Sequence, residues 1–187
     1  MQTYISILRG INVGGKKKIK MEELKAAYES LGFENIRTYI QTGNVIFDSS
    51  VPNESDINAS IRNQLAAVFG FQISVLIRRM DGFQQIIKGN PFLDEQAVDP
   101  RALHVTFLSQ APSQTALAVI EPAADDGDQY RFSDSNEEVY LFCPDGYGRT
   151  RLSNSFFEKK LGVSATTRNW NTVNRLYEIA GTESSEY

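Results

Sequence analysis

Residues 37–48 read RTYIQTGNVIFD, and this stretch decides the predicted fold. Two runs rich in β-branched and aromatic residues flank Thr42-Gly43, a pattern typical of two antiparallel strands joined by a tight turn. An amphipathic helical pattern lies on each side, over residues 21–31 and 57–68, and apolar strand-like runs lie outside both. The order strand, helix, strand, strand, helix, strand over residues 1–79 predicts a ferredoxin-like half.

Three glycines indicate where helices end. Gly32, Gly70 and Gly162 each follow an amphipathic run and precede an apolar residue. Glycine after a helix adopts the left-handed conformation at low cost, and the apolar residue that follows packs back onto the last turn. The same junction at three places therefore predicts three helix ends.

A similar order of patterns returns after residue 100. ALHVTFL predicts a strand, residues 113–120 a short helix, QYRFSDSNEEVYLFC a hairpin, and residues 153–161 a helix followed by an extended segment. We therefore predict an α+β protein of two ferredoxin-like halves, 1–79 and 101–187, with antiparallel sheets covered by helices. Residues 80–100 are expected to form a connector with a short helix, and residues 169–180 a C-terminal helix.

The composition is that of an ordinary globular protein. The chain has 187 residues, of which 41% are hydrophobic and 22% are charged. The single cysteine, Cys143, excludes an internal disulfide. No apolar run is long enough to span a membrane, and the first residues lack the charge order of a signal peptide. We expect a cytoplasmic protein with no membrane partner.

Positive charge is concentrated in two segments of an acidic chain. Residues 1–20 carry a net charge of +5 and residues 143–175 carry +4, whereas the whole chain carries −4. The overall sign disfavours non-specific nucleic-acid binding. The uneven distribution favours local anion sites, although two solvated basic loops would produce the same pattern.

The first basic segment, GINVGGKK at residues 10–17, resembles a phosphate-binding P-loop. Three features argue against a nucleotide hydrolase. Lys17 stands where a hydroxyl would bind Mg²⁺, the helical pattern begins near Met21 rather than at the lysine, and the hairpin that follows is not part of a parallel sheet. What remains is a loop whose Gly14 and Gly15 amides converge on an anion beside Lys16. In the alternative, the glycines serve only the backbone angles of the loop.

The second basic segment, PDGYGRTRLSNS at residues 144–155, precedes a predicted helix. Its glycine-rich turn leads into Arg149, Thr150 and Arg151. Arginine forks and a helix N-terminus both bind phosphate or carboxylate, so an anion pocket is one interpretation. Arg168, which precedes the last helix, would complete it. The alternative is a tight loop with a capped helix and two surface arginines.

Other chemistry-bearing residues are few. His104 is the only histidine and would serve as a general base at its ordinary pKa, but the sequence indicates no partner for it. Cys143 has no neighbouring cysteine or histidine. One histidine and one cysteine do not suggest a metal centre, and we expect neither a metal nor a cofactor.

Six blocks occur in order: LRGINVGGKKKIKMEEL, TYIQTGNVIF, NPF, LHVTFL, PDGYGRTRL and TTRNWNTVNRL. In combination they closely resemble an uncharacterised bacterial family, the domain of unknown function 1697. The resemblance extends from Tyr4 to about Leu176 and implies a two-part α+β protein of ferredoxin-like halves. It implies no catalytic residue. Where the glycine-arginine loop of the family often continues with Ser and Lys, this chain has Thr150 and Arg151.

The leading hypothesis is a cofactor-free protein that binds a small phosphate- or carboxylate-bearing ligand. The fold would bring two distant basic turns together into one pocket made by Gly14, Gly15, Lys16, Arg149, Thr150, Arg151 and Arg168. Three alternatives stay open. They are an RNA or single-stranded DNA binder that uses the same loops with sheet aromatics, an enzyme on a phosphorylated metabolite with His104 or an Asp such as Asp48 as base, and a scaffold or interaction module.

Overall fold

The computed structural model describes residues 1–94, 98–120 and 127–182 of the chain. The chain divides into two compact units. Unit 1 holds Met1–Phe83 and the residues from Leu176 onward, and unit 2 holds Gln84–Arg175. The expected connector, residues 80–100, is thus shared between the two units, and the end of the C-terminal helix belongs to unit 1.

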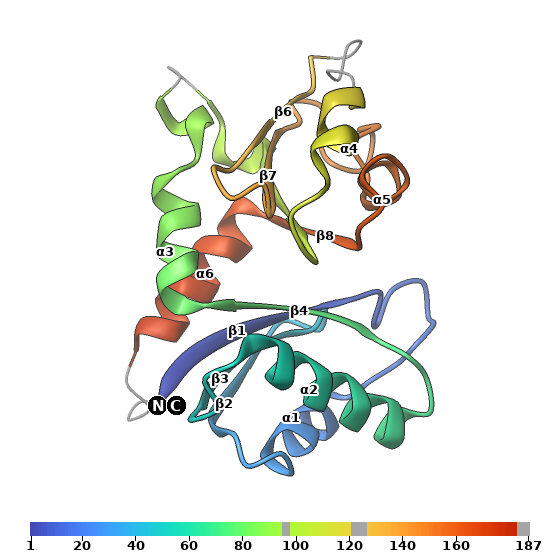
Figure 1. Cartoon of the computed structure of the whole chain (residues 1–187), viewed down its shortest axis with the longest axis vertical. Helices are drawn as coiled ribbons and strands as arrows, with labels where there is room; N and C mark the ends of the chain where they lie inside the picture. Colours follow the sequence, from blue (N-terminus) through green and yellow to red (C-terminus); the bar gives the residue numbers. More distant parts are fainter. Residues whose placement is uncertain (95–97, 121–126, 183–187) are drawn as a thin grey trace. The chain divides into compact units, whose positions relative to one another are not determined.

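Unit 1 contains a four-stranded antiparallel sheet with two helices on one face (Figure 1). Its elements are β1 (Gln2–Arg9), α1 (Met21–Glu29), β2 (Glu34–Tyr39), β3 (Asn44–Ser49), α2 (Glu54–Phe69) and β4 (Ser74–Arg79). The strand order is β2-β3-β1-β4, and each neighbouring pair is antiparallel. The hairpin makes β2 and β3 neighbours, and its turn comprises residues 40–43 rather than Thr42-Gly43 alone, because Tyr39 pairs with Asn44.

Unit 2 repeats this plan. Its elements are η1 (Pro91–Asp94), η2 (Pro100–Ala102), β5 (Leu103–Leu108), α4 (Gln114–Val119), β6 (Gln129–Phe132), β7 (Glu138–Phe142), α5 (Asn154–Leu161) and β8 (Ala165–Asn169). The strand order β6-β7-β5-β8 matches that of unit 1. Two helices, α3 (Met80–Lys88) and α6 (Trp170–Gly181), each contain a boundary between the units. The predicted α+β fold with two antiparallel sheets and a C-terminal helix is therefore confirmed.

Two of the three predicted helix ends are confirmed, whereas α1 ends at Glu29 with Ser30 as its C-cap, before the left-handed Gly32. Gly70 and Gly162 are left-handed C-caps of α2 and α5, with φ of 76° and 71°. The helix α2 is capped at its start by Asn53, whose side chain accepts from the Ser55 amide. The helix begins one turn earlier than its apolar pattern, because the first turn is polar and faces water.

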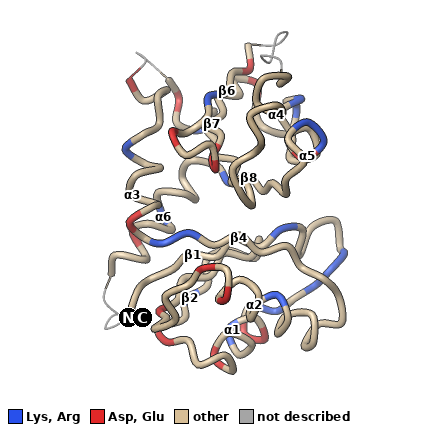
Figure 2. The backbone as a smooth tube through the Cα atoms, in the orientation of Figure 1, with Lys and Arg blue, Asp and Glu red and all other residues tan. Residues whose placement is uncertain are grey.

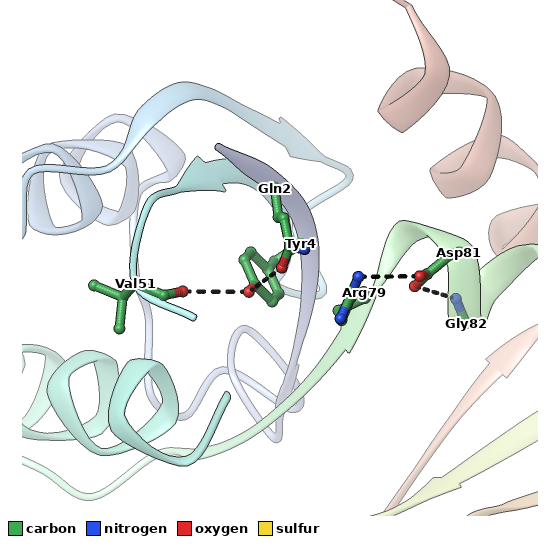
Figure 3. Close-up of polar contacts among 6 residues, drawn as sticks. All are labelled: Gln2, Tyr4, Val51, Arg79, Asp81 and Gly82. Carbon is green, nitrogen blue, oxygen red and sulfur yellow. Dashed lines mark hydrogen bonds and ion pairs between the residues drawn. The ribbon is translucent and has the colours of Figure 1, made fainter. Parts of the chain in front are cut away.

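The core of unit 1 lies between the sheet and its two helices. Phe47 is its centre, with ring centroids 5.7 Å from Tyr4, 5.4 Å from Tyr28 and 4.6 Å from Phe33. The Tyr4 ring is buried, but its hydroxyl lies 3.0 Å from Gln2 Oε1 and 3.3 Å from the Val51 carbonyl, so the polar end is satisfied (Figure 3).

The start of α3 is held by a small polar cluster at the end of β4. Arg79 Nη2 lies 3.2 Å from Asp81 Oδ2, and the Gly82 amide donates to Asp81 Oδ1 at 2.8 Å (Figure 3). An acidic side chain in the first turn of a helix also interacts favourably with the helix dipole. Both contacts lie where β4 passes directly into α3.

Gly43 is expected to tolerate no side chain. Its φ is +82°, and a Cβ atom would lie 2.7 Å from Ile11 Cδ1 and 2.8 Å from Leu8 Cβ. Gly43→Ala should lower the free energy of unfolding by about 2–4 kcal/mol, from left-handed strain and overpacking together. Urea denaturation followed by circular dichroism measures this.

Gly82→Ala is the matched control for that substitution. Gly82 lies inside α3, its φ is not positive, and nothing lies within 4 Å of an added Cβ. The same chemical change should therefore raise stability by about 0.5–1 kcal/mol. Equal effects of the two substitutions would contradict this account of Gly43.

Candidate functional site

The first predicted loop, residues 10–20, is held in one conformation by Asn12. The Asn12 Nδ2 group donates to the Ile19 carbonyl at 2.9 Å and to the Gln41 carbonyl at 2.8 Å, and its Oδ1 accepts from the Ile19 amide at 2.8 Å. The Asn12 amide donates to the Lys17 carbonyl. These bonds close the loop on itself and join it to the turn at Gln41, so two of the six motif blocks meet here.

Gly14 and Gly15 form the tip of this loop. They are the central residues of a tight turn closed by the Lys16 amide, which donates to the Val13 carbonyl at 3.1 Å. Their φ angles, 58° and 74°, are those of a type I′ turn, which strongly favours glycine. The backbone thus explains both glycines. Among the described residues, the Gly14 and Gly15 amides have no acceptor.

The lysines of the loop do not all have the same role. Lys17 Nζ donates to the Gln72 carbonyl at 2.9 Å and lies 5.4 Å from the Phe71 ring centroid, so it ties the loop to the segment before β4. Lys16 and Lys18 are exposed, and neither forms an ion pair within the part of the chain that the structure describes. Figure 2 shows the resulting run of positive charge between β1 and α1.

The second predicted loop, residues 144–153, is built from two successive turns. The Gly146 amide donates to the Cys143 carbonyl, and the Arg149 amide donates to the Gly146 carbonyl. The Thr150 hydroxyl donates to Asp128 and accepts from the Leu152 amide at 3.0 Å. The hydroxyl proton of Thr150 is therefore used in a hydrogen bond that fixes the loop. Arg149 is exposed at the surface of the loop.

Arg168 faces away from this loop. In the sheet register Arg168 pairs with Val105, so its side chain lies on the face opposite His104. Its Nη1 donates to Thr166 Oγ1 at 3.1 Å and to the Thr167 carbonyl at 3.0 Å. Burial lowers the pKa of Arg168 to about 10, which leaves it charged at neutral pH.

The predicted anion residues are therefore distributed over both units. Gly14, Gly15 and Lys16 belong to unit 1, and the arginines belong to unit 2. The single pocket that would join them stays a prediction.

Unit 2 contains a partly buried polar cluster on the helix-covered face of its sheet. The His104 ring stacks on Tyr147, with centroids 5.0 Å apart and an interplanar angle of 27°. The Tyr147 hydroxyl donates to Thr167 Oγ1 at 3.0 Å, and Thr167 Oγ1 donates to Asn154 Oδ1 at 2.7 Å. Thr106 Oγ1 lies 2.7 Å from Thr167 Oγ1. Because Thr167 donates its only proton to Asn154, Thr106 is the donor in that contact.

Sequence reasoning missed the partners of His104. Each comes from a different motif block: His104 from LHVTFL, Tyr147 from PDGYGRTRL and Thr167 from TTRNWNTVNRL. The order of the blocks was the available signal, but it contained no information on which side chains would meet. This cluster, which we call the His104 cluster, comprises His104, Thr106, Tyr147, Asn154 and Thr167.

Other candidate groups have structural partners or lack reactivity. Burial raises the pKa of the Cys143 thiol to about 11, which disfavours the thiolate. Asp48 accepts from Thr3 Oγ1 and Asn35 Nδ2, both at 2.7 Å. Within residues 1–94, 98–120 and 127–182, no three histidine, cysteine or acidic side chains gather closely enough to hold a metal ion. No helix of these residues has the length and apolar character needed to cross a membrane.

Comparison with known proteins identifies a family and a fold. Residues 1–140 match the family described as "Protein of unknown function (DUF1697)". A solved structure, that of the conserved bacterial protein SP0830 from Streptococcus pneumoniae, is similar over 96% of this chain and 98% of its own chain. The TM-score is 0.75 and the sequence identity 20%, so the likeness concerns the fold alone. A comparison with curated proteins finds no match.

Burial of His104 should make stability depend on pH. The side chain is 8% exposed, and desolvation lowers its pKa below the ordinary value. As the pH falls through about 6.5, the unfolded state binds a proton that the folded state does not, so the free energy of unfolding should fall. Urea denaturation between about pH 8 and pH 5 measures the effect.

His104→Phe provides the reference for that experiment, since it keeps a stacked ring but does not titrate. The variant should lose the fall in stability that begins near neutral pH. Identical pH profiles for the two proteins would show that the folded and unfolded states hold His104 at the same pKa.

Proposed function

The chain belongs to the DUF1697 family of proteins of unknown function, and from the geometry of its loops we propose that it binds small phosphate- or carboxylate-bearing ligands. The observation that carries the proposal is the tip of the β1–α1 loop, where two backbone amides without an acceptor among the described residues adjoin two exposed lysines. A second anion contact is proposed at Arg149 and Arg151 of unit 2.

The β1–α1 loop suits an anion because its conformation exists before binding. Asn12 and Lys17 take part in five hydrogen bonds, including the one from the Asn12 amide. Three of these bonds lie within the loop, and the other two reach the Gln41 and Gln72 carbonyls of unit 1. A loop that is already ordered loses less conformational entropy when a ligand binds. The Gly14 and Gly15 amides would then approach an anion without a prior rearrangement.

The distribution of charge supports the same site. The chain as a whole carries −4, and several of its exposed cations lie beside acids. On α1, for example, Lys25 lies 3.9 Å from Glu29. Lys16 and Lys18 have no such neighbour among the described residues, and the loop therefore presents a local positive potential to a diffusing anion.

Nucleic-acid binding on the sheet is less well supported. Proteins that read RNA with this strand order stack bases on exposed sheet aromatics. In unit 1, Tyr4 and Phe47 face the helices and are fully buried. The opposite face of the central strands carries Ile5, Ile7 and Ile46, which are also buried. The sheet thus offers bases no exposed ring on its central strands.

Phosphate titration followed by NMR tests the proposal directly. Inorganic phosphate should shift the Gly14 and Gly15 amide resonances, and Lys16→Gln with Lys18→Gln should weaken binding about tenfold, or about 1.4 kcal/mol. Lys159→Gln with Lys160→Gln is the control, since it removes the same charge from exposed positions in the last turn of α5. Arg149→Gln with Arg151→Gln reports on the second contact.

Two results would overturn the proposal. One is that phosphate at low salt shifts neither the Gly14 nor the Gly15 amide resonance. The other is an equal loss of affinity in the loop variant and in the α5 control, which would mean that only net charge matters. Affinity that appears only with oligonucleotides and grows with their length would favour the nucleic-acid alternative instead.

A further inference from the structure

We propose that the anion contact at Arg149 and Arg151 selects anions that also carry an O–H group, such as hydrogenphosphate, and that this O–H group donates a hydrogen bond to His104 Nε2. The inference rests on the proposed function, because it requires that Arg149 and Arg151 attract an anion. It adds the chemistry that decides which anion is accepted.

The repeated fold provides an internal comparison for the His104 cluster. Leu8 and Leu108 occupy equivalent positions in the two units. The Leu8 amide donates to the Gly43 carbonyl just before β3, and the Leu108 amide donates to the Glu137 carbonyl just before β7, both at 2.8 Å. Counting back along each central strand, Ser6 is equivalent to Thr106 and Tyr4 to His104. In the neighbouring strand, Ile77 pairs with Ser6, whereas Thr167 pairs with Thr106. Unit 2 thus has more polar groups at these positions: a histidine and two threonines stand where unit 1 has a tyrosine, a serine and an isoleucine.

The two units also differ in what covers these positions. In unit 1, α1 buries Leu24, Ala27 and Tyr28, and the Tyr28 hydroxyl lies 2.8 Å from Ser6 Oγ in a fully buried pair. In unit 2, α4 has only six residues and buries none of them completely. The loop that carries Tyr147 lies over the polar positions instead, and Tyr147 is only partly buried. A small ligand would therefore meet loop side chains rather than a packed helix.

The protons of the cluster can be assigned to their acceptors. Tyr147 and Thr106 donate to Thr167, and Thr167 donates to Asn154. The Ala102 carbonyl only accepts, so the contact at 3.3 Å with His104 Nδ1 places the proton on that nitrogen. In the neutral ring, Nε2 then carries the lone pair. No donor among the described residues reaches it.

An acceptor without a donor distinguishes between anions of similar shape. Hydrogenphosphate and sulfate are both tetrahedral and doubly charged, but only hydrogenphosphate has an O–H group. A hydrogenphosphate held by the arginines would donate this proton to Nε2, whereas a sulfate oxygen would face the lone pair and lose the contact. His104 stacks on Tyr147, which lies two residues before Arg149 in the same loop, and this contact is the reason for assigning both groups to one ligand.

The test compares the two anions on wild-type protein and on His104→Phe at about pH 8, where the histidine is neutral. Wild-type protein should bind hydrogenphosphate about tenfold or more tightly than sulfate. His104→Phe keeps the stacked ring but removes Nε2, and should abolish the preference. Thr106→Val is the control, because it alters the cluster without touching Nε2 and should keep the preference.

NMR of the imidazole gives a second readout that needs no variant. The chain has one histidine, so its ring nitrogen resonances are unambiguous. Hydrogenphosphate should shift the Nε2 resonance, and sulfate should not. A preference that survives in His104→Phe, or an Nε2 resonance that hydrogenphosphate does not move, would overturn the inference while the proposed function stood. If neither anion binds at all, the proposed function fails as well.

Discussion

The pairing of one central strand with two antiparallel neighbours is the constraint on which each unit depends. In unit 1, β1 lies between β3 and β4, and in unit 2, β5 lies between β7 and β8. The register of these pairs decides which side chains face the helices, since a slip of one residue would exchange the two faces of a strand. Tyr4, Ser6 and Leu8 share one face for this reason, as do His104, Thr106 and Leu108. The same pairing places the β1–α1 loop beside the hairpin turn, where Asn12 joins them.

The fold was predictable because its signals are local. Thr42-Gly43 between two β-rich runs, and glycine followed by an apolar residue at Gly70 and Gly162, each specify a backbone geometry within a few residues. Six helices or strands in a fixed order then leave few arrangements open. The start of α2 was harder to place. Its first turn has no apolar residue, so the hydrophobic pattern begins later than the helix.

The sites were harder to predict because their contacts join residues that are far apart in the sequence. Lys17 reaches the Gln72 carbonyl across 55 positions, and this contact separates it from Lys16 and Lys18, which look identical to it in the sequence. Thr150 has the hydroxyl expected of an anion site, yet its proton goes to Asp128. Stacking of His104 on Tyr147 depends on how the 144–153 loop folds over β5. No periodic pattern encodes such contacts, so residue type alone does not reveal them.

The polar cluster of unit 2 is larger than its counterpart in unit 1 and needs a reason to persist. At the equivalent strand positions unit 1 has a fully buried tyrosine, a buried serine and an isoleucine, so the fold does not require a histidine and two threonines there. Burial of the imidazole lowers stability at acid pH, because the folded state resists its protonation. Hydrogen bonds join Tyr147, Thr106, Thr167 and Asn154, whereas no donor among the described residues reaches Nε2. Polar residues at positions where the fold does not require them are expected at functional sites. A ligand that donates to Nε2 would complete the cluster, and this is the physical reason for placing the selective contact there rather than at the glycine turn.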